Sequence, residues 1–271
     1  MSQSDSLILE ERRDDVVTLS FNDPDHLNAM TRQMGECFAE RVTDLATDHS
    51  LRAVVLTGKG RAFSAGGDMT MLREQADEGR AHPGIARRAI SDRMRSFYTL
   101  FLTVRSLPCP TIAALNGHAI GAGFCVALAC DLRLVAHEAL LGLNFTRLGL
   151  HPGMAATWTL PRLVGPALAA ELLYTSRVVG GEEAARIGLA NRALPADKVL
   201  SAALSLAEEM AENAPLANRA VKRALARSDQ ASLEDQLSFE AAEQAATFES
   251  EDVHEGLAAI QERRTPRFRG E

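Results

Sequence analysis

Short β-branched runs alternate with helical patterns over the first two thirds of the chain. Residues 16–21 (VVTLSF) and 52–57 (RAVVLT) are bounded by turn residues, which is typical of strands. Between them, residues 31–45 place apolar side chains at helical spacing, with Thr31 as the expected N-cap. This order of strand, helix and strand predicts a parallel α/β architecture.

The alternation continues to residue 136, with a further strand pattern at residues 131–136. Residues 111–130 contain no charged side chain and match a membrane span in length. One asparagine, one histidine and three glycines interrupt this stretch, and Asn-Gly is a turn signal. We therefore expect a buried strand at residues 111–115 and a buried helix at residues 121–130, and no contact with a membrane.

From about residue 195 the pattern becomes entirely helical. Three alanine-rich segments follow one another, separated by Pro215 and by the pair Ser228 and Asp229. No internal repeat or low-complexity linker divides the chain. We expect two parts that pack together, an α/β core over residues 1–194 and a helical region over residues 195–271.

Composition adds limits on the possible partners. The chain has 271 residues, of which 46% are hydrophobic, enough for one large core. A net charge of -7 disfavours nucleic acid and anionic membranes, whereas local basic clusters offer places for an acidic ligand. The clusters are Lys59 with Arg61, Lys222 with Arg223, and Arg263 with Arg264 and Arg267.

The cysteines and histidines predict neither disulfides nor a metal site. The four cysteines form no C-x-x-C pair and no zinc spacing, so we expect buried free thiols in a reducing compartment. The seven histidines show no H-E-x-x-H motif. The first fifteen residues are polar and acidic, unlike a signal or transit peptide, and we expect a cytoplasmic protein.

Two glycine-rich turns are candidates for binding an anion. Residues 59–69 (KGRAFSAGGDM) follow a predicted strand and precede a predicted helix; the structural alternative is an ordinary turn with Asp68 as N-cap. Residues 116–124 (NGHAIGAGF) repeat the arrangement, with a helix from near Ala122, and Val126 breaks the dinucleotide fingerprint there. Because small residues let backbone N–H groups approach a ligand, the two turns together predict a two-donor oxyanion hole.

A serine nucleophile is a second interpretation of the first turn. The sequence AFSAG around Ser64 resembles the G-x-S-x-G elbow, with Asp131 and His151 following in hydrolase order. Against it, Ser64 lies seven positions past the predicted strand end at Thr57, and the first glycine of the motif is missing. His151 is also a candidate for proton transfer because it lies in a loop near the predicted site, although loop histidines are more often structural.

Four motifs occur in order along the chain: FNDPDHLNAMT (21–31), AFSAGGDM (62–69), LNGHAIGAGFCVALACDLRL (115–134) and GLNFTRLGLHPG (142–153). Together they closely resemble the enoyl-CoA hydratase/isomerase (crotonase) superfamily. The resemblance implies a spiral of ββα units with a C-terminal helical oligomerisation region, assembled as a homotrimer or a dimer of trimers. It also implies an acyl-CoA thioester as ligand in fatty acid metabolism, with coenzyme A as part of the substrate and no separate cofactor.

The resemblance assigns roles to individual positions of this sequence. It implies that the backbone N–H groups of Gly67 and Ala122 hold the thioester oxygen. It implies that the coenzyme A and acyl path is lined by Leu27, Ala29, Ala65, Asp68, Met69 and Gly121. Some family members place an acid further along the last motif, near His151 here, and Asp68 lies beside one donor.

The chain departs from the family pattern at Cys125 and Phe145. Hydratases of this family carry glutamates at these two positions. Hydration needs an activated water and a proton donor, and a phenylalanine supplies neither, so we expect weak or no hydration. We therefore expect an acyl-CoA lyase or isomerase of this family, with its reaction unassigned. The alternatives are an acyl-CoA binding protein without catalysis, which these two substitutions motivate, and a serine hydrolase using Ser64.

Overall fold

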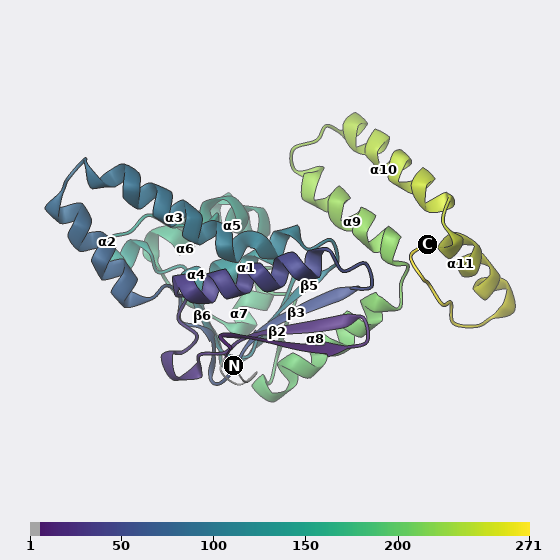
Figure 1. The fold of residues 1–271 in the computed structure, drawn as a ribbon, viewed down its shortest axis with the longest axis horizontal. Helices are drawn as coiled ribbons and strands as arrows, with labels where there is room; N and C mark the ends of the chain where they lie inside the picture. The colour runs from purple at the N-terminus through teal and green to yellow at the C-terminus, as the bar shows by residue number, and fades with distance from the viewer. Residues whose placement is uncertain (1–5) are drawn as a thin grey trace.

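The computed structural model describes residues 6–271 and contains two sheets with helices on both sides (Figure 1). Residues 1–5, the start of the segment for which we expect no targeting signal, lie outside the described residues. The larger sheet has the strand order β1 (Ile8–Arg13), β2 (Val16–Phe21), β3 (Ala53–Gly58), β5 (Thr111–Leu115), β7 (Leu132–Ala136) and β10 (Arg192–Leu194). The smaller sheet has the order β4 (Ala62–Ser64), β6 (His118–Ile120), β8 (Leu140–Gly142) and β9 (Val179–Gly180).

A repeated unit builds both sheets at once. The long strands β3, β5 and β7 are each followed within a few residues by a short strand, β4, β6 or β8, so the chain steps three times from the larger sheet to the smaller one. Neighbouring long strands in this set are parallel, and so are the neighbouring short strands. One or two helices follow each pair: α2 (Met69–Ala81) with α3 (Ala86–Leu102), then α4 (Ala122–Ala129), then α5 (Ala156–Val164) with α6 (Pro166–Thr175). The predicted spiral of ββα units is confirmed.

The central strands are buried on both faces because helices cover the larger sheet from two sides. All residues of β2, β3 and β5 are buried. The helix α1 (Arg32–Ala46) packs on one side, and Thr31 caps it as predicted, with its hydroxyl accepting a hydrogen bond from the Met34 N–H at 3.1 Å. The helix α8 (Ala196–Ala211) packs against β3, β5 and β7. Two-sided burial explains why the strands read as continuous apolar runs rather than alternating ones.

Residues 111–130 form three separate elements rather than one long helix. They contain the strand β5, the short strand β6 and the helix α4, in which every residue is buried. Within residues 6–271, no helix is both long and apolar enough to span a bilayer. The short helix α7 (Gly181–Arg186) precedes β10.

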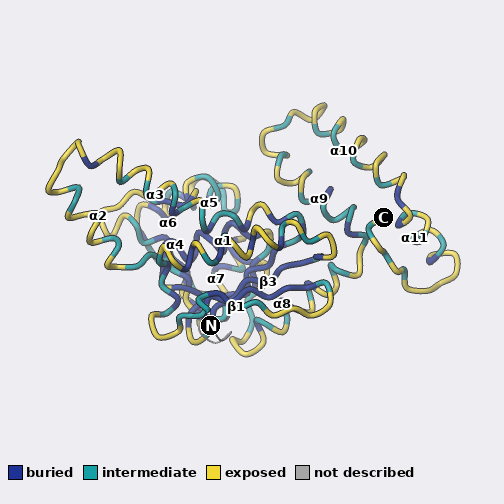
Figure 2. Tube along the Cα trace, viewed as in Figure 1, coloured by how far each residue is buried: buried dark blue, intermediate teal, exposed yellow. Residues whose placement is uncertain are grey.

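The last three helices stand away from the sheets (Figure 1). They are α9 (Pro215–Ser228), α10 (Leu233–Phe248) and α11 (Glu251–Glu262). No residue of α10 is buried, and Figure 2 shows this helix mostly exposed. Large apolar side chains are open to solvent here, including Leu233 at 77% and Ile260 at 77%.

Candidate active site

The two glycine-rich turns meet because they follow neighbouring parallel strands. The strands β4 and β6 pair in parallel, with Ser64 opposite Ala119, so both end at the same edge of the smaller sheet. From that edge the chain enters residues 65–68 after β4 and the helix α4 after β6. A Cβ atom added to Gly66 would lie 3.5 Å from the Ala122 nitrogen, so the first turn packs directly against the start of α4.

Gly67 and Ala122 present backbone donors that no acceptor among residues 6–271 uses. Met30 N donates to Gly66 O at 2.7 Å and Asp68 N donates to Met30 O at 3.1 Å, which leaves the Gly67 N–H between them. Ala122 begins α4, where N–H groups have no acceptor within the helix. Neither N–H has an acceptor within the part of the chain that the structure describes. Two such donors, one at a helix N-terminus, favour a negatively charged oxygen between them.

The turns require glycine at Gly66 and Gly121 for conformational reasons. Their φ angles are +97° and +51°, a region that residues with a Cβ rarely adopt. A side chain at Gly66 would also meet the Ile120 carbonyl oxygen at 2.7 Å. Gly67 is different, because a Cβ there would meet only flexible side-chain ends at about 3.9 Å.

The segment around Leu27 lies alongside the first turn. Ala65 N donates to Leu27 O at 2.9 Å, which places two of the predicted path residues next to the Gly67 donor. Leu27 and Asn28 both have φ of +54°, and Asn28 fixes this bend with its side-chain Nδ2, which donates to Ala62 O at 2.9 Å. Ala29 is half-buried. Sequence reasoning missed Asn28, whose tolerance of the left-handed region was the available signal.

Asp68 caps the helix α2, the structural alternative considered from the sequence. Its Oδ1 accepts a hydrogen bond from Met71 N at 2.8 Å. Asp68 is half-buried, and its Oδ2 has no hydrogen-bond partner among residues 6–271. The neighbouring Met69 is 58% exposed. The carboxylate beside the Gly67 donor therefore has one oxygen held and one open.

Cys125 lies in α4, and Phe145 lies beside Gly121, which precedes that helix. Cys125 is buried one helical turn after Ala122, and its thiol donates a hydrogen bond to Gly153 O at 3.7 Å. Burial raises the pKa of Cys125 far above its ordinary value, so the thiol is neutral at any working pH. Phe145 is half-buried, and its ring Cζ lies 4.0 Å from the position of a Cβ on Gly121. Neither residue carries a charge into the site.

All four cysteines are free, as expected from their spacing. Cys109, Cys125 and Cys130 are buried, and burial raises the pKa of Cys109 to about 11 and that of Cys130 to about 12. The expectation of four buried thiols is wrong for Cys37, which is only half-buried because it lies at the border between the buried face of α1, which carries Met34 and Phe38, and its exposed face.

The structure corrects the argument made about Ser64. Ser64 ends the short strand β4, which the sequence pattern did not reveal, so it does lie at a strand end; the strand predicted to end at Thr57 is β3, which ends one residue later at Gly58. The hydroxyl is fully buried and committed: it donates to Asn28 O at 2.7 Å and accepts from Gly66 N at 3.1 Å. Asp131, the proposed acid partner, accepts a hydrogen bond from Lys222 Nζ at 2.9 Å. Ser64 supports the turn, and among residues 6–271 its hydroxyl bonds only to backbone groups and to no basic side chain.

The candidate His151 is exposed in the loop before α5. Its Nδ1 lies 2.7 Å from the neighbouring Pro152 carbonyl oxygen. Two residues later, Gly153 is buried against Cys125 and against the phenol ring of Tyr98, a contact that the sequence did not reveal. Within residues 6–271, no three His, Cys, Asp or Glu side chains lie close enough together to hold a metal ion.

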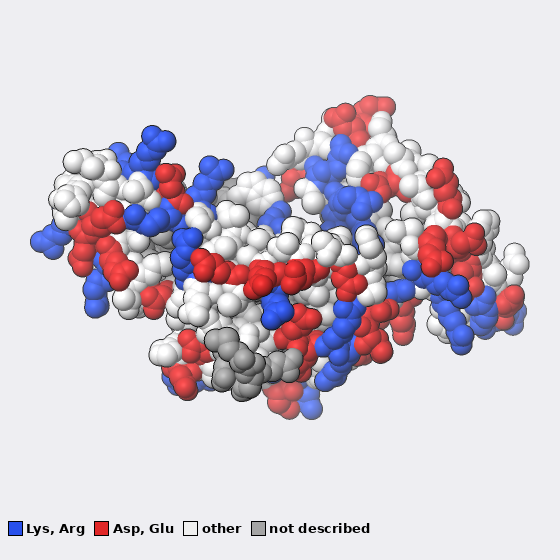
Figure 3. Space-filling view, viewed as in Figure 1, with Lys and Arg blue, Asp and Glu red and all other residues white. Residues whose placement is uncertain are grey.

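Most of the predicted basic clusters are already neutralised by acidic partners. Lys59 pairs with Glu11 at 2.9 Å, and Lys222 pairs with Asp131. Opposite charges lie close together over the face in Figure 3. Arg61 is exposed on the loop before β4 and makes no ion pair within the described residues. Arg61 therefore remains the open cation nearest in sequence to the first turn.

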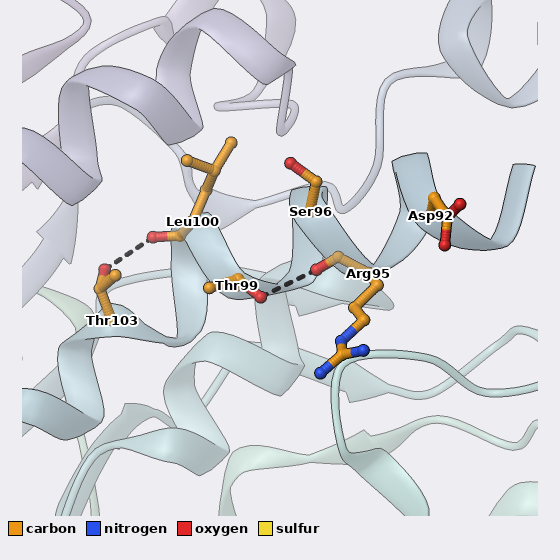
Figure 4. A pocket seen from close by; sticks show the side chains of 6 residues that line it. All are labelled: Asp92, Arg95, Ser96, Thr99, Leu100 and Thr103. Carbon is orange, nitrogen blue, oxygen red and sulfur yellow. Dashed lines mark hydrogen bonds between the residues drawn. The ribbon is translucent and has the colours of Figure 1, made fainter. Parts of the chain in front are cut away.

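A separate hollow of about 380 Å³ lies along α3 (Figure 4). It is lined by Asp92, Arg95, Ser96, Thr99, Leu100 and Thr103. The Thr99 and Thr103 hydroxyls donate to carbonyl oxygens of their own helix, at 2.9 and 2.6 Å. None of the predicted site residues lines this hollow, and it offers no converging donors.

Comparison with known proteins covers nearly the whole chain. The sequence profile of the family described as Enoyl-CoA hydratase/isomerase matches residues 11–271. The 2,3-dehydroadipyl-CoA hydratase of Escherichia coli is 33% identical, over 98% of this chain and 99% of its own. The mitochondrial methylglutaconyl-CoA hydratase of Mus musculus is 34% identical, over 97% of this chain and 82% of its own. The crystal structure of an enoyl-CoA hydratase from Bacillus anthracis superposes with a TM-score of 0.88 at 34% identity, covering 98% of this chain and all of that one.

Proposed function

The chain belongs to the enoyl-CoA hydratase/isomerase family, and from that premise we propose that it binds an acyl-CoA thioester and stabilises negative charge on the thioester oxygen. The observation that carries the proposal is the meeting of two open donors, the N–H groups of Gly67 and Ala122, at one edge of the smaller sheet. An oxygen between them becomes more negative when the thioester enolises. The donors are fixed before the reaction, so stabilising that charge costs no reorganisation.

The ligand path follows from the segments that border this pair of donors. Residues 27–29 and 65–69 run side by side, with the Ala65 to Leu27 hydrogen bond between them. We expect the pantetheine arm along this border and the nucleotide phosphates toward Arg61. An arginine without an acidic partner binds phosphate oxygens with charge-assisted hydrogen bonds. The net charge of -7 makes such a local cation necessary.

The reaction we propose is enolate chemistry in which efficient hydration is not the main outcome. Cys125 is a neutral buried thiol and Phe145 is a hydrocarbon, so neither activates water or donates a proton. Two of the candidate bases from the sequence remain: the open Oδ2 of Asp68, next along the chain to the Gly67 donor, and the ring of the exposed His151, two residues before Gly153. Because two of the relatives are named as hydratases of CoA thioesters, we propose a lyase or isomerase reaction on an acyl-CoA thioester.

A second candidate function is acyl-CoA binding without turnover. Cys125 in α4 and Phe145 beside Gly121 favour this function, because neither residue can activate water or donate a proton. Exchange of the α-hydrogen of butanoyl-CoA in deuterated water separates the two functions, since an enolate-forming enzyme incorporates deuterium and a binding protein does not. A wild-type protein that binds butanoyl-CoA without exchange would leave only the binding function.

Calorimetry tests the ligand class itself. We expect butanoyl-CoA to bind measurably, and butanoate to bind far more weakly because it lacks the thioester and the nucleotide. Coenzyme A alone serves as a control for the nucleotide contribution. Equal affinity for butanoyl-CoA and butanoate would contradict the proposed function.

We infer in addition that α9, α10 and α11 form contacts between subunits. Their exposed apolar side chains, among them Leu225 at 69% and Leu233 at 77%, exceed what an isolated helical region usually leaves in water. A closed trimer or a dimer of trimers would bury them. Sedimentation equilibrium measures the assembly, and a monomer at micromolar concentration would contradict the inference.

A further inference from the structure

Tyr98 places a phenol in the region near Cys125 that the proposed reaction leaves without a polar group. It lies on α3 between the buried Phe97 and Phe101, and is itself half-buried against the core. Its ring meets that of Phe97 edge-on, with the ring centroids 6.4 Å apart. The aromatic neighbours fix the ring on the inner side of α3.

The hydroxyl end of this ring reaches the loop that precedes α5. A Cβ added to Gly153 would lie 2.6 Å from Tyr98 Cζ and closer still to the hydroxyl oxygen, so any side chain there would have to displace the Tyr98 ring. The Gly153 carbonyl oxygen in turn accepts the hydrogen bond from the Cys125 thiol at 3.7 Å. Tyr98, Gly153 and Cys125 thus form one cluster drawn from α3, the loop before α5 and α4.

This cluster lies one helical turn from the proposed oxyanion site. Cys125 follows Ala122 by three residues of α4, which places the two on the same side of the helix, about 4.5 Å apart along its axis. The Tyr98 hydroxyl is therefore close to where the acyl chain of a thioester would run once its carbonyl oxygen lies on the Ala122 N–H.

The Tyr98 hydroxyl is an open donor. It makes no hydrogen bond within the part of the chain that the structure describes, whereas the Cys125 thiol is already committed to Gly153. Partly buried tyrosine hydroxyls normally find a partner, in the protein, in water or in a ligand. Burial in the first place, and the neighbouring Cys125 in the second, raise the pKa of Tyr98, so the phenol stays protonated and keeps an O–H donor at neutral pH.

We propose that Tyr98 determines specificity by donating a hydrogen bond from its hydroxyl to an oxygen on the β-carbon of the bound acyl chain. The inference rests on the proposed function, because the thioester carbonyl must first lie on the Gly67 and Ala122 donors. The β-carbon is two bonds from the thioester carbon, so a β-oxygen extends along α4 toward Cys125. The chemical class selected is the 3-oxoacyl or 3-hydroxyacyl thioester, in preference to the saturated one.

Two thioesters that differ only in the β-oxygen test the proposal. Calorimetry with 3-oxobutanoyl-CoA and with butanoyl-CoA is carried out on wild type, on Tyr98→Phe and on Tyr174→Phe. Tyr174 is the only other tyrosine and is 81% exposed, which makes it the matched control. Tyr98→Phe should lower the affinity for 3-oxobutanoyl-CoA about 3- to 10-fold, the range for one neutral hydrogen bond. The same substitution should change the affinity for butanoyl-CoA by less than about 2-fold. Tyr174→Phe should change neither.

The phenol also supplies a signal that a purely structural role would not alter. In the Tyr174→Phe protein, Tyr98 is the single tyrosine, and its near-ultraviolet absorbance should shift with 3-oxobutanoyl-CoA and stay unchanged with butanoyl-CoA. Gly153→Ala provides a second perturbation, because the added Cβ displaces the Tyr98 ring and should also remove the preference for the β-oxygen.

The outcomes separate this inference from the proposed function. If Tyr98→Phe lowered the affinity for both thioesters equally, the ring would contribute packing alone. That result would overturn the inference, while the proposed function stands. Unchanged affinity for both thioesters would overturn it in the same way. A wild-type protein that binds neither thioester would remove the inference and the proposed function together.

Discussion

Gly67→Pro removes one of the two proposed oxyanion donors, and Gly67→Ala keeps it. Proline has no N–H, and the Gly67 N–H has no acceptor among residues 6–271, so the substitution breaks no hydrogen bond within the described chain. The two hydrogen bonds that hold the turn, from Met30 N to Gly66 O and from Asp68 N to Met30 O, do not involve Gly67. Loss of one fixed donor typically costs about 3 to 4 kcal/mol in the transition state, a factor of about 100 to 1,000 in rate.

The alanine variant calibrates the effect of the side chain. A Cβ at Gly67 would meet Met71 Cε and Leu72 Cδ1 at 3.9 Å, which is ordinary van der Waals contact. We therefore expect the reaction rate of Gly67→Ala to stay within about threefold of the wild-type rate, because the variant retains the N–H donor and creates no clash. The contrast between the two variants isolates the N–H from the extra atoms.

Deuterium exchange at the α-carbon of butanoyl-CoA, followed by mass spectrometry, measures the rate, and thermal unfolding checks that each variant is folded. Wild type should exchange deuterium fastest and Gly67→Ala nearly as fast. Gly67→Pro should exchange more slowly than wild type by two to three orders of magnitude. A folded Gly67→Pro protein with the wild-type exchange rate would refute the oxyanion assignment. An equal loss in both variants would attribute the effect to distortion of the turn.

The remaining predictions concern the missing acids, the buried serine and a buried thiol. Wild type should scarcely hydrate a short enoyl-CoA, whereas Cys125→Glu combined with Phe145→Glu should gain hydration, measured as loss of the conjugated thioester absorbance; efficient wild-type hydration would contradict the account. Each single variant should gain less, and burial will raise the pKa of the introduced carboxyl groups. Ser64→Ala should lower the free energy of unfolding by about 1 to 3 kcal/mol, because it leaves the buried partners of the hydroxyl unpaired. A fluorophosphonate should leave Ser64 of the wild-type protein unlabelled. Labelling of Ser64 would restore the hydrolase interpretation. Burial raises the pKa of Cys109 from 9.0 to about 11, so the stability that its neutral thiol contributes is present below pH 9 and is lost as the pH rises through 11. The free energy of unfolding in urea should therefore fall less steeply with pH in Cys109→Ala than in wild type over that range. Equal slopes in the two proteins would contradict the assignment.

The long strands and the caps were predictable from the sequence because their signals are local. β-Branched runs mark β2, β3 and β5, and Thr31 caps α1 through a hydrogen bond within its own first turn. The two strand-to-helix turns were visible as glycine clusters. The two turns meet because β4 and β6 pair in parallel. Each of these strands is only three residues long, so the sequence pattern did not reveal the pairing.

The parts that were missed depend on contacts between distant segments. The strand β4 is only three residues long, so the sequence ended the preceding strand at Thr57 and placed Ser64 in a loop. Tyr98 belongs to an ordinary amphipathic helix, and nothing in its neighbours indicates that its ring reaches Gly153 some fifty residues later. The sequence predicted Lys59 to be an open cation, because it did not show that Glu11 of β1 lies beside it in the folded chain.

In the proposed oxyanion hole, two backbone donors hold the thioester carbonyl of an acyl-CoA ligand. Isotope-edited infrared difference spectroscopy of butanoyl-CoA, labelled with ¹³C at the thioester carbon, measures the carbonyl stretch in the complex directly. We predict a lower frequency on the wild-type protein than in water, because two fixed N–H groups at Gly67 and Ala122 polarise the bond, and a partial return toward the water value in Gly67→Pro. A bound thioester whose carbonyl frequency equals that in water would contradict the claim.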